Sequence, residues 1–276
     1  MSRLFKLGSN KMRTDLTHQT IFAVGCGTPD GEINNGLAAA LAFGENGARV
    51  FIVDRDKDAL ALASGRLAEQ NITHATALAD VTDEDSIAKA LNECRSHFED
   101  PSVLYYNVGI VKDGGPTEIT TDDFISALKI NVAGAFTTIR LVLPAMIKAK
   151  YGRIITVSSV GGIRSVGYNY PAYSSSKAAL IELTKSVGIA YAKEGIRANT
   201  IAPGFIASPL VAKSLSSNYS TNADMLKRRN AASPTGEMGR PEDIASAAVF
   251  LASKAADYIN AALIPVDGGL IHTTPN

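Results

Sequence analysis

Tyr173 and Lys177 are the residue pair whose types and spacing best fit a chemical reaction. They stand four residues apart in the run Tyr-Ser-Ser-Ser-Lys, so in a helix both side chains lie on one face. An ammonium about 4 Å from a phenol favours the phenolate by roughly 4 kcal/mol, an upper bound of about three pK units. We therefore expect Tyr173 to exchange a proton with an alcohol or a carbonyl oxygen. For the pair alone, a surface tyrosine and lysine on an amphipathic helix is the alternative.

A second group of residues has the pattern of a dinucleotide site. An apolar run from Phe22 ends in glycines, a helical segment begins at Gly36, and Asp54 closes the next apolar run, 18 residues after Gly36. Glycines let a backbone approach a pyrophosphate, and the N-terminus of a helix supplies free N–H groups. An acid at this spacing accepts hydrogen bonds from the adenosine ribose. The expected phosphate-binding residues are Gly25, Gly27, Asn34, Asn35 and Gly36.

Asp54 also indicates which cofactor binds. A 2′-phosphate about 4 Å from this carboxylate is repelled by roughly 4 kcal/mol at an effective dielectric constant near 20. The segment from Gly25 to Ala48 contains no lysine or arginine to offset that repulsion. The sequence therefore predicts NAD rather than NADP. Arg55, which follows directly, is the alternative partner for an extra phosphate, although a solvated charge at the strand end is the interpretation we favour.

The elements that position these residues alternate between short β-branched runs and longer segments of helical period. This pattern predicts an α/β fold, a single-domain, doubly wound Rossmann sheet of about seven parallel strands with helices on both faces. The expected strands are Thr20–Val24, Arg49–Asp54, Ala75–Leu78, Val103–Tyr106, Arg153–Ser158, Arg197–Ile201 and Leu263–Val266. The expected helices are Gly36–Glu45, Lys57–Glu69, Asp83–His97, Asp122–Lys148, Ala172–Ala192 and Glu242–Ala252.

Domain boundaries and helix ends follow from the same pattern. We expect an N-terminal extension over residues 1–18 and one domain over residues 19–276. Residues 203–240 lack a clear period, which predicts a lid on the substrate side. Thr82, three residues before Asp85, has the pattern of a helix start, and Gly195 that of a helix stop.

Composition excludes several classes of function. The 276 residues contain 27 basic and 27 acidic side chains, which argues against broad electrostatic binding of nucleic acid or of an anionic membrane. The two cysteines form no C-x-x-C pair and the four histidines have no metal-ligand spacing, so we expect neither a disulfide framework nor a metal site. No apolar stretch has the uninterrupted length of a membrane span. These features favour a cytoplasmic protein that acts on small molecules.

The order of the motifs resembles that of the short-chain dehydrogenase/reductase family, from Thr20 to Leu270. The Tyr-x-x-x-Lys signature falls on Tyr173 and Lys177, the strand before it ends at Ser158 and Ser159, and Lys-Ile-Asn places the family's asparagine at Asn131. The resemblance implies that Tyr173 is the acid/base and that Lys177 lowers its pKa and holds the nicotinamide ribose. It also implies that Ser159 hydrogen-bonds the substrate oxygen and that Asn131 positions a water for proton relay.

The same resemblance implies further cofactor contacts and an assembly. Asp80 and Val81 match the pair that contacts adenine, and Ile206 and Ser208 lie where the family contacts the carboxamide of nicotinamide. The remaining contacts that it implies are Asn107, Val108, Gly109, Pro203 and Gly204. A homotetramer or homodimer, formed through the long helices that contain Asn131 and Tyr173, is also implied.

Two departures from the family pattern leave alternatives open. Gly25 and Gly36 are 11 residues apart, with an insertion from Thr28 to Ile33 whose acids, Asp30 and Glu32, we expect to point to solvent. In addition, Tyr170 precedes Lys177 by seven residues, the spacing of the enoyl-reductase branch.

The function predicted from the sequence is an NAD-dependent oxidoreductase that interconverts a secondary alcohol and a ketone. An enoyl-thioester reductase using Tyr170 and an NADP-dependent ketoreductase of the 3-oxoacyl type are alternatives, and a non-enzymatic NAD-binding regulator is the least favoured. The candidate pocket residues are Arg164, Tyr168, Tyr170, Phe205, Leu210 and Tyr219. For Arg164 a solvated side chain is favoured over an anion contact, and for Lys227-Arg228-Arg229 a charged outer helix face is favoured over steering of an acidic substrate.

Overall fold

A seven-stranded parallel sheet forms the centre of the chain in the computed structural model, which describes residues 14–208 and 221–273. The spatial order is β3-β2-β1-β4-β5-β6-β7, so the direction of winding reverses between β1 and β4. The strands are β1 Thr20–Val24, β2 Arg49–Asp54, β3 His74–Leu78, β4 Val103–Tyr106, β5 Gly152–Val157, β6 Ile196–Pro203 and β7 Leu263–Val266. This confirms the predicted fold class, with strand ends that differ by at most two residues.

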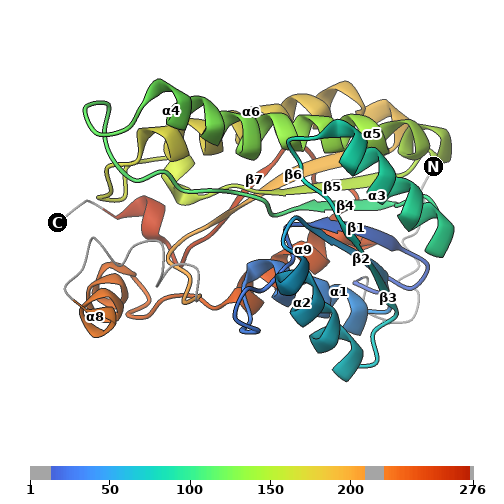
Figure 1. Cartoon of the computed structure of the whole chain (residues 1–276), viewed down its shortest axis with the longest axis horizontal. Coiled ribbons are helices and arrows are strands. Elements are labelled where there is room, and N and C mark those ends of the chain that lie inside the picture. Colours follow the sequence, from blue (N-terminus) through green and yellow to red (C-terminus); the bar gives the residue numbers. More distant parts are fainter. Residues whose placement is uncertain (1–13, 209–220, 274–276) are drawn as a thin grey trace, which may run out of the picture.

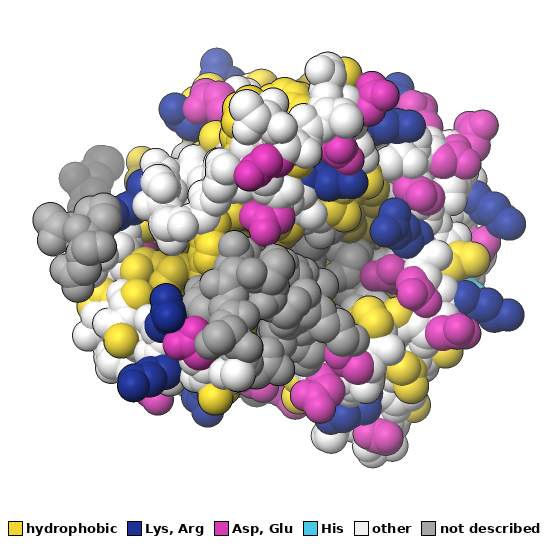
Figure 2. All heavy atoms as spheres, turned by 60° about the vertical axis from the view of Figure 1, so that its left-hand side comes forward, with side chains coloured by type: hydrophobic (Ala, Val, Ile, Leu, Met, Phe, Trp, Pro, Cys, Tyr) yellow, Lys and Arg dark blue, Asp and Glu magenta, His cyan; other side chains and the backbone are white. Residues whose placement is uncertain are grey.

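Helices cover both faces of the sheet (Figure 1). One face carries α1 Asn35–Glu45, α2 Lys57–Glu69 and α9 Pro241–Ala252, and the other carries α3 Glu84–His97, α4 Thr121–Leu128, α5 Gly134–Ala149 and α6 Pro171–Ala190. The inner strands β1, β2, β4, β5 and β6 are mostly buried from both sides, which explains their largely apolar sequences, whereas β3 and β7 at the edges of the sheet are mostly half-buried. Charges of both signs are interspersed on the face shown in Figure 2, in keeping with the balanced composition.

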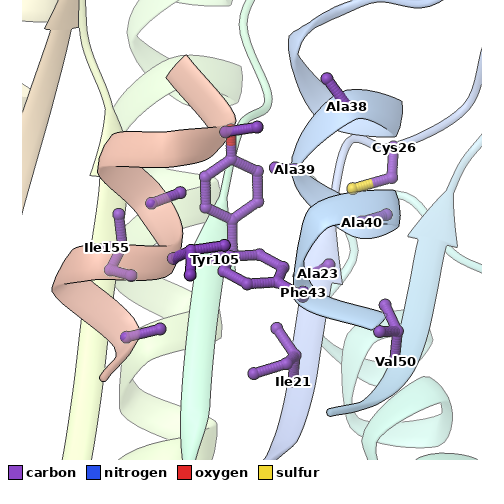
Figure 3. Close-up of a cluster of buried hydrophobic side chains, with 14 of the residues drawn as sticks. Ile21, Ala23, Cys26, Ala38, Ala39, Ala40, Phe43, Val50, Tyr105 and Ile155 are labelled. Carbon is purple, nitrogen blue, oxygen red and sulfur yellow. The ribbon is translucent and has the colours of Figure 1, made fainter. Parts of the chain in front are cut away.

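The core on the α1 side shows how the two halves of the chain pack together. Phe43 from α1 and Tyr105 from β4 are fully buried and meet edge to face, with ring centroids 5.5 Å apart. Figure 3 shows these rings between α1 and α9, with Ile21 and Ile155 nearby on the sheet. Burial of large side chains of this kind stabilises the fold by about 1.5–3 kcal/mol each.

One segment contains a helix that the sequence pattern did not indicate. Within residues 203–240, which we expected to be a lid without regular structure, α8 spans Asn222–Ala232 and lies beyond the carboxyl ends of the strands (Figure 1). Residues 209–220 lie outside the described residues, as do residues 1–13 of the expected N-terminal extension. The lid and the extension therefore stay predictions.

One of the two expected helix ends needs correction, whereas Gly195 does end a helical turn. Asp83, not Thr82, caps α3, because its carboxylate accepts hydrogen bonds from the N–H groups of Asp85 and Ser86. Gly195 ends a short 3₁₀ helix, Ala192–Glu194, which follows α6 after the α-helix has already ended at Ala190.

One long helical stretch runs from Thr121 to Ala149 and comprises α4, a π-helical turn at Lys129–Ala133, and α5. By length and composition alone it is able to cross a membrane, and 44% of its most apolar window is buried inside the protein. Ile139, Val142 and Met146 pack against the sheet. A core helix has the same composition, so this stretch is weak evidence for a membrane span.

Gly195 offers a test of the chain path between α6 and β6. Its φ is +81°, and a Cβ atom there would lie 2.0 Å from the carbonyl oxygen of Lys150. We expect Gly195→Ala to lower the free energy of unfolding by about 3 kcal/mol, since backbone strain adds to a steric clash. Gly236 has the same φ of +81° with open space around it, so Gly236→Ala is the control at about 1 kcal/mol. Equal losses in urea unfolding would contradict this packing.

Candidate active site

A cavity of about 380 Å³ lies at the carboxyl ends of the central strands. The loops that follow β1, β4, β5 and β6 line it, at the point where the winding of the sheet reverses, which is where open α/β sheets bind ligands. Most of the predicted site residues line this cavity: Gly25, Gly27, Asn34, Asn35, Asp54, Arg55, Asp80, Val81, Asn107, Val108, Gly109, Ser159, Tyr173, Lys177, Pro203, Gly204, Ile206 and Ser208. Gly36 and Asn131 lie behind the lining.

Lys177 lies almost completely buried on the first half of α6, with only 3% of its surface exposed. Its Nζ donates hydrogen bonds to the carbonyl oxygen of Val157, at 2.9 Å, and to that of Val108, at 3.5 Å. Val157 is the last residue of β5, and Val108 lies in the loop that follows β4. The hydrogen bonds of the ammonium therefore connect α6 to the carboxyl ends of both strands. Burial lowers the pKa of Lys177 to about 8 because the charged form loses its hydration.

Tyr173 shares the cavity with Lys177 and Ser159. Burial raises the pKa of Tyr173 above its ordinary value, while a side-chain hydrogen bond with Ser159 and the charge of Arg229 oppose that shift. Ser159 begins the short turn after β5, and its Oγ also accepts a hydrogen bond from the N–H of Gly161 at 3.1 Å. A tyrosine and a serine hydroxyl therefore meet at one point in the cavity, an arrangement that is chemically able to hydrogen-bond and protonate an oxygen atom.

The predicted direction of the Tyr173 pKa shift is corrected by the structure. We predicted that the ammonium moves the pKa of Tyr173 downward, whereas burial moves it upward. Lys177 Nζ lies 5.8 Å from the centre of the Tyr173 ring, and its hydrogen bonds go to backbone carbonyls. The prediction assumed a separation of about 4 Å, and it neglected the cost of burying the phenolate.

Asn131 supports the site from behind the cavity wall. Its side chain is fully buried in the π-helical turn between α4 and α5. The amide oxygen accepts from the N–H of Ile110, and the amide nitrogen donates to the carbonyl of Ile110 and to Ser176 Oγ, all within 3.0 Å. Ser176, which the sequence analysis did not single out, also donates to the carbonyl of Tyr173 at 2.7 Å. Asn131 therefore fixes the loop after β4 relative to the first turn of α6.

The N-terminus of α1 forms the nucleotide end of the cavity. Asn34 caps the helix by accepting from the N–H of Leu37, and its amide donates to the carbonyl of Gly27 at 2.9 Å. The first hydrogen bond inside the helix is donated by Ala38, so the N–H groups of Asn35 and Gly36 remain available for an anion among the described contacts.

The glycines at this end fit a bound dinucleotide. A Cβ at Gly25 would lie 2.9 Å from Val108, and one at Gly36 would lie 2.3 Å from the carbonyl oxygen of Gly25. The absence of side chains there brings the helix N-terminus against the ends of β1 and β4. Asn35 Oδ1 is buried without a hydrogen-bond partner among the described residues, which leaves an acceptor for a ligand hydroxyl or amide.

Asp54 closes the nucleotide end from β2. Its Oδ2 accepts from the N–H of Gly27 at 2.8 Å, and its Oδ1 accepts from the N–H of Asp56 at 3.1 Å. The carboxylate therefore orders the glycine loop in addition to lining the cavity. Arg55 is exposed at the rim, and its charge helps to lower the pKa of Asp80, although the backbone hydrogen bond from Thr82 contributes most.

The insertion in the glycine loop is held by its own hydrogen bonds. Thr28 Oγ1 donates to the carbonyl of Glu32 at 2.6 Å, and Asp30 accepts from the N–H of Glu32. Asp30 and Glu32 are both exposed, as expected for acids beside a phosphate site. Asp30 nevertheless lines the mouth of the cavity.

The substrate end is lined by aromatic rings. Tyr168 and Tyr170 stack with centroids 5.4 Å apart, and Tyr170 meets Tyr173 edge to face at 5.2 Å. Phe205 meets Tyr168 edge to face, with ring centroids 6.4 Å apart. Arg164 does not line the cavity, because its guanidinium donates to the carbonyls of Ile271 and Thr273. Leu210 and Tyr219 lie outside the described residues.

Arg229 is the site residue that the sequence analysis assigned to the wrong surface. Lys227 and Arg228 are exposed on α8, as we predicted for the whole basic run, but Arg229 is 4% exposed and lines the cavity. Three successive residues on a helix point in different directions, so one of them faces inward wherever the helix packs.

Comparison with known proteins places these features in context. Residues 34–271 match a family model described as "Enoyl-(Acyl carrier protein) reductase". The cis-4-hydroxycyclohexanecarboxylate dehydrogenase of Sinomonas cyclohexanicum is 35% identical over 85% of this chain and 91% of its own length. The 3-oxoacyl-acyl-carrier-protein reductase FabG of Thermotoga maritima is 32% identical, with 86% and 93% covered. A solved gluconate 5-dehydrogenase from Burkholderia cenocepacia, in complex with NADP and tartrate, is 27% identical with a TM-score of 0.84, covering 95% of this chain and 98% of that one.

The low pKa of Lys177 predicts a pH dependence of stability. The unfolded chain keeps this lysine charged up to its ordinary pKa of 10.5, while the folded chain loses the proton near pH 8. The unfolded state therefore binds more protons between these values, so stability rises with pH across this window. We expect the free energy of unfolding of the native protein to gain roughly 3 kcal/mol at most relative to Lys177→Met between pH 8 and 10.5.

Urea unfolding from pH 7 to 10.5 measures this difference. Lys185→Met removes a half-exposed lysine from the same helix and should leave the pH dependence unchanged. A constant difference between the native protein and Lys177→Met would show that the buried ammonium keeps its ordinary pKa.

Proposed function

The chain belongs to the short-chain dehydrogenase/reductase family as an oxidoreductase acting on CH–OH groups, and we propose that it interconverts a secondary alcohol and its ketone with NAD as cofactor. The observation that carries this proposal is the meeting of Tyr173, Ser159 and Lys177 in one cavity. The open N-terminus of α1 lies at the other end of the same cavity.

In the proposed reaction the side chains bind the reacting oxygen and move its proton. A nicotinamide cofactor bound in the cavity supplies the hydride acceptor or donor. Ser159 hydrogen-bonds the oxygen of the substrate, and Tyr173 Oη takes its proton in oxidation or returns it in reduction. Lys177, seated on the carbonyls of Val157 and Val108, carries the positive charge that stabilises the phenolate when the proton has left.

Asn131 has a positioning role in this proposal. It holds Ile110 beside the cavity and, through Ser176, the turn of helix that carries Tyr173. The proposed proton path runs from Tyr173 toward Lys177 and the region of Asn131. A Cβ placed on Gly109 would lie 2.8 Å from Lys177 Nζ and 3.8 Å from Asn131 Oδ1, which supports their proximity.

The choice of NAD rests on Asp54 at the rim of the nucleotide end. Its carboxylate repels a 2′-phosphate, and the glycine loop offers no cation in compensation. Arg55 also lines the cavity, and a relative of known structure binds NADP, so an NADP-dependent ketoreductase of the 3-oxoacyl type is the alternative. Oxidation of the alcohol is the direction that we infer with NAD.

An enoyl-thioester reductase is the second candidate, favoured by the description of the matching family model and by Tyr170. Tyr170 lines the cavity, and burial raises its pKa far above the ordinary value. Tyr173, however, is the tyrosine that hydrogen-bonds Ser159 and has Lys177 beside its ring. The complete set of Asn131, Ser159, Tyr173 and Lys177 also disfavours a non-enzymatic NAD-binding regulator.

The names of the relatives suggest which substrates to try first. The panel consists of cyclic alcohols, sugar acids and hydroxyacyl thioesters, each class chosen after the name of one of these relatives, and NADH production is the measurement. A small molecule is the only partner that we propose beyond a second copy of the chain. The homotetramer or homodimer stays a prediction that analytical sedimentation tests. The cytoplasmic location also stays a prediction, and cell fractionation tests it.

Tyr173→Phe tests the acid/base assignment. Removing the hydroxyl leaves the ring packing intact, so we expect turnover to fall by about 100- to 10,000-fold with cofactor binding unchanged, measured by steady-state kinetics and NADH fluorescence. Tyr170→Phe is the matched control and should retain activity within a few-fold. Activity that survives Tyr173→Phe but not Tyr170→Phe would instead support the enoyl-reductase assignment.

Asp54→Asn tests the choice of cofactor. The amide oxygen keeps an acceptor for the N–H of Gly27, while the negative charge is lost. We expect the affinity for NADP to rise by as much as about 1,000-fold, with little change for NAD, in calorimetric titrations. Asp54→Ala removes the loop contact as well and should weaken both cofactors. Tighter binding of NADP than of NAD by the unaltered protein would overturn the assignment.

A further inference from the structure

Arg229 is a buried cation at the substrate end of the cavity. It lies on α8 with 4% of its surface exposed, whereas Arg228 beside it is 69% exposed and pairs with Asp224. Guanidinium groups are rarely buried unless an acid or a set of acceptors replaces their hydration. The groups around Arg229 therefore indicate which kind of ligand its guanidinium group binds.

The contacts of Arg229 within the described residues leave its charge without an acid. Its guanidinium carbon lies 4.3 Å above the Phe205 ring, and Nη1 donates to Tyr168 Oη at a long 3.4 Å. Nε is buried and has no hydrogen-bond partner there. None of the ion pairs within residues 14–208 and 221–273 involves Arg229.

The charges along the cavity are divided between its two ends. Asp30, Asp54, Arg55 and Asp80 lie at the nucleotide end, whereas the charged lining residues at the catalytic end are Lys177 and Arg229. The positive charge of Arg229 reaches both Tyr173 and Tyr170 and opposes the rise of their pKa values, whereas the negative charge of Asp113 adds to the rise at Tyr170. An anionic group on the substrate would thus enter a region of positive potential, walled by aromatic rings, close to the reacting oxygen.

We propose that Arg229 binds a carboxylate of the substrate, so that the natural substrates are hydroxy acids and the corresponding oxo acids. The unpartnered Nε–H and the adjacent terminal nitrogen form an edge that suits a carboxylate, which accepts two parallel hydrogen bonds. Phe205 and Tyr168 hold the guanidinium plane in place, so little side-chain entropy is lost on binding. This inference rests on the proposed alcohol and ketone chemistry of the same cavity.

Pairs of acid and ester isolate the contribution of this contact. The probes are 3-hydroxybutyrate and 3-hydroxycyclohexanecarboxylate, each compared with its methyl ester, in NADH production and in calorimetric titration of the cofactor-bound enzyme. We expect the unaltered protein to favour the acids by about 10- to 100-fold in kcat/KM. Arg229→Met should remove this preference, mainly through a higher KM for the acid, with little change for the ester.

Two further variants separate binding from folding. Arg228→Met removes the neighbouring exposed arginine and should leave the preference unchanged. Arg229→Lys keeps the charge without the two parallel donors and should retain part of the preference, so it decides the matter if Arg229→Met does not fold.

The outcomes distinguish this proposal from the proposed function. Acid binding that depends on Arg229, in a protein that oxidises neither acid nor ester, would contradict the chemistry but support the carboxylate site. Equal kcat/KM for acid and ester, or equal binding where neither is oxidised, would overturn the carboxylate site. Equal losses for both probes on changing Arg229 would also overturn it, in favour of a packing role against Phe205.

Discussion

The burial of one ammonium group constrains the whole catalytic half of the molecule. Lys177 is held by the carbonyls of Val157 and Val108, and it has no buried acid as a partner among the described residues. A charge in such a position is tolerated only if backbone dipoles replace its hydration. The ends of β4 and β5 and the first turns of α6 must therefore keep their relative positions, and Tyr173, one turn before Lys177, is positioned with them.

The same region shows how a buried polar side chain finds its hydrogen-bond partners. Asn131 occupies a π-helical turn, where the normal helical hydrogen-bond pattern is interrupted, and it uses both ends of its amide on Ile110 and Ser176. Such turns often occur at functional sites because the interruption redirects a side chain. The loop after β4, the α4–α5 stretch and α6 are joined at this one buried side chain.

The sequence was sufficient to predict the sheet and a set of candidate site residues, most of which line one cavity in the structure. Buried parallel strands need continuous apolar runs, which made β1 to β7 recognisable. Glycines, helix caps and signature residues are local sequence patterns, so the residues around Tyr173 could be predicted as well. The features that were not predicted depend on tertiary contacts. The helix α8 has no strong apolar period, the π-helical turn at Asn131 is hidden in a continuous helical pattern, and the burial of Arg229 follows from how α8 packs. The direction of the pKa shift of Tyr173 failed for the same reason, because it depends on burial.

Asp54 connects nucleotide choice to loop architecture, since the carboxylate at the rim of the cavity also accepts the N–H of Gly27. A Cβ at Gly27 would lie 2.7 Å from that carboxyl group, so the two positions are sterically matched as well. In evolutionary terms, a descendant that replaces this acid keeps the turn only if the new residue still offers an acceptor to the N–H of Gly27. Descendants that lack such an acceptor lose the contact with Gly27 as well as the charge, so the turn restricts which residues can follow the acid at this position.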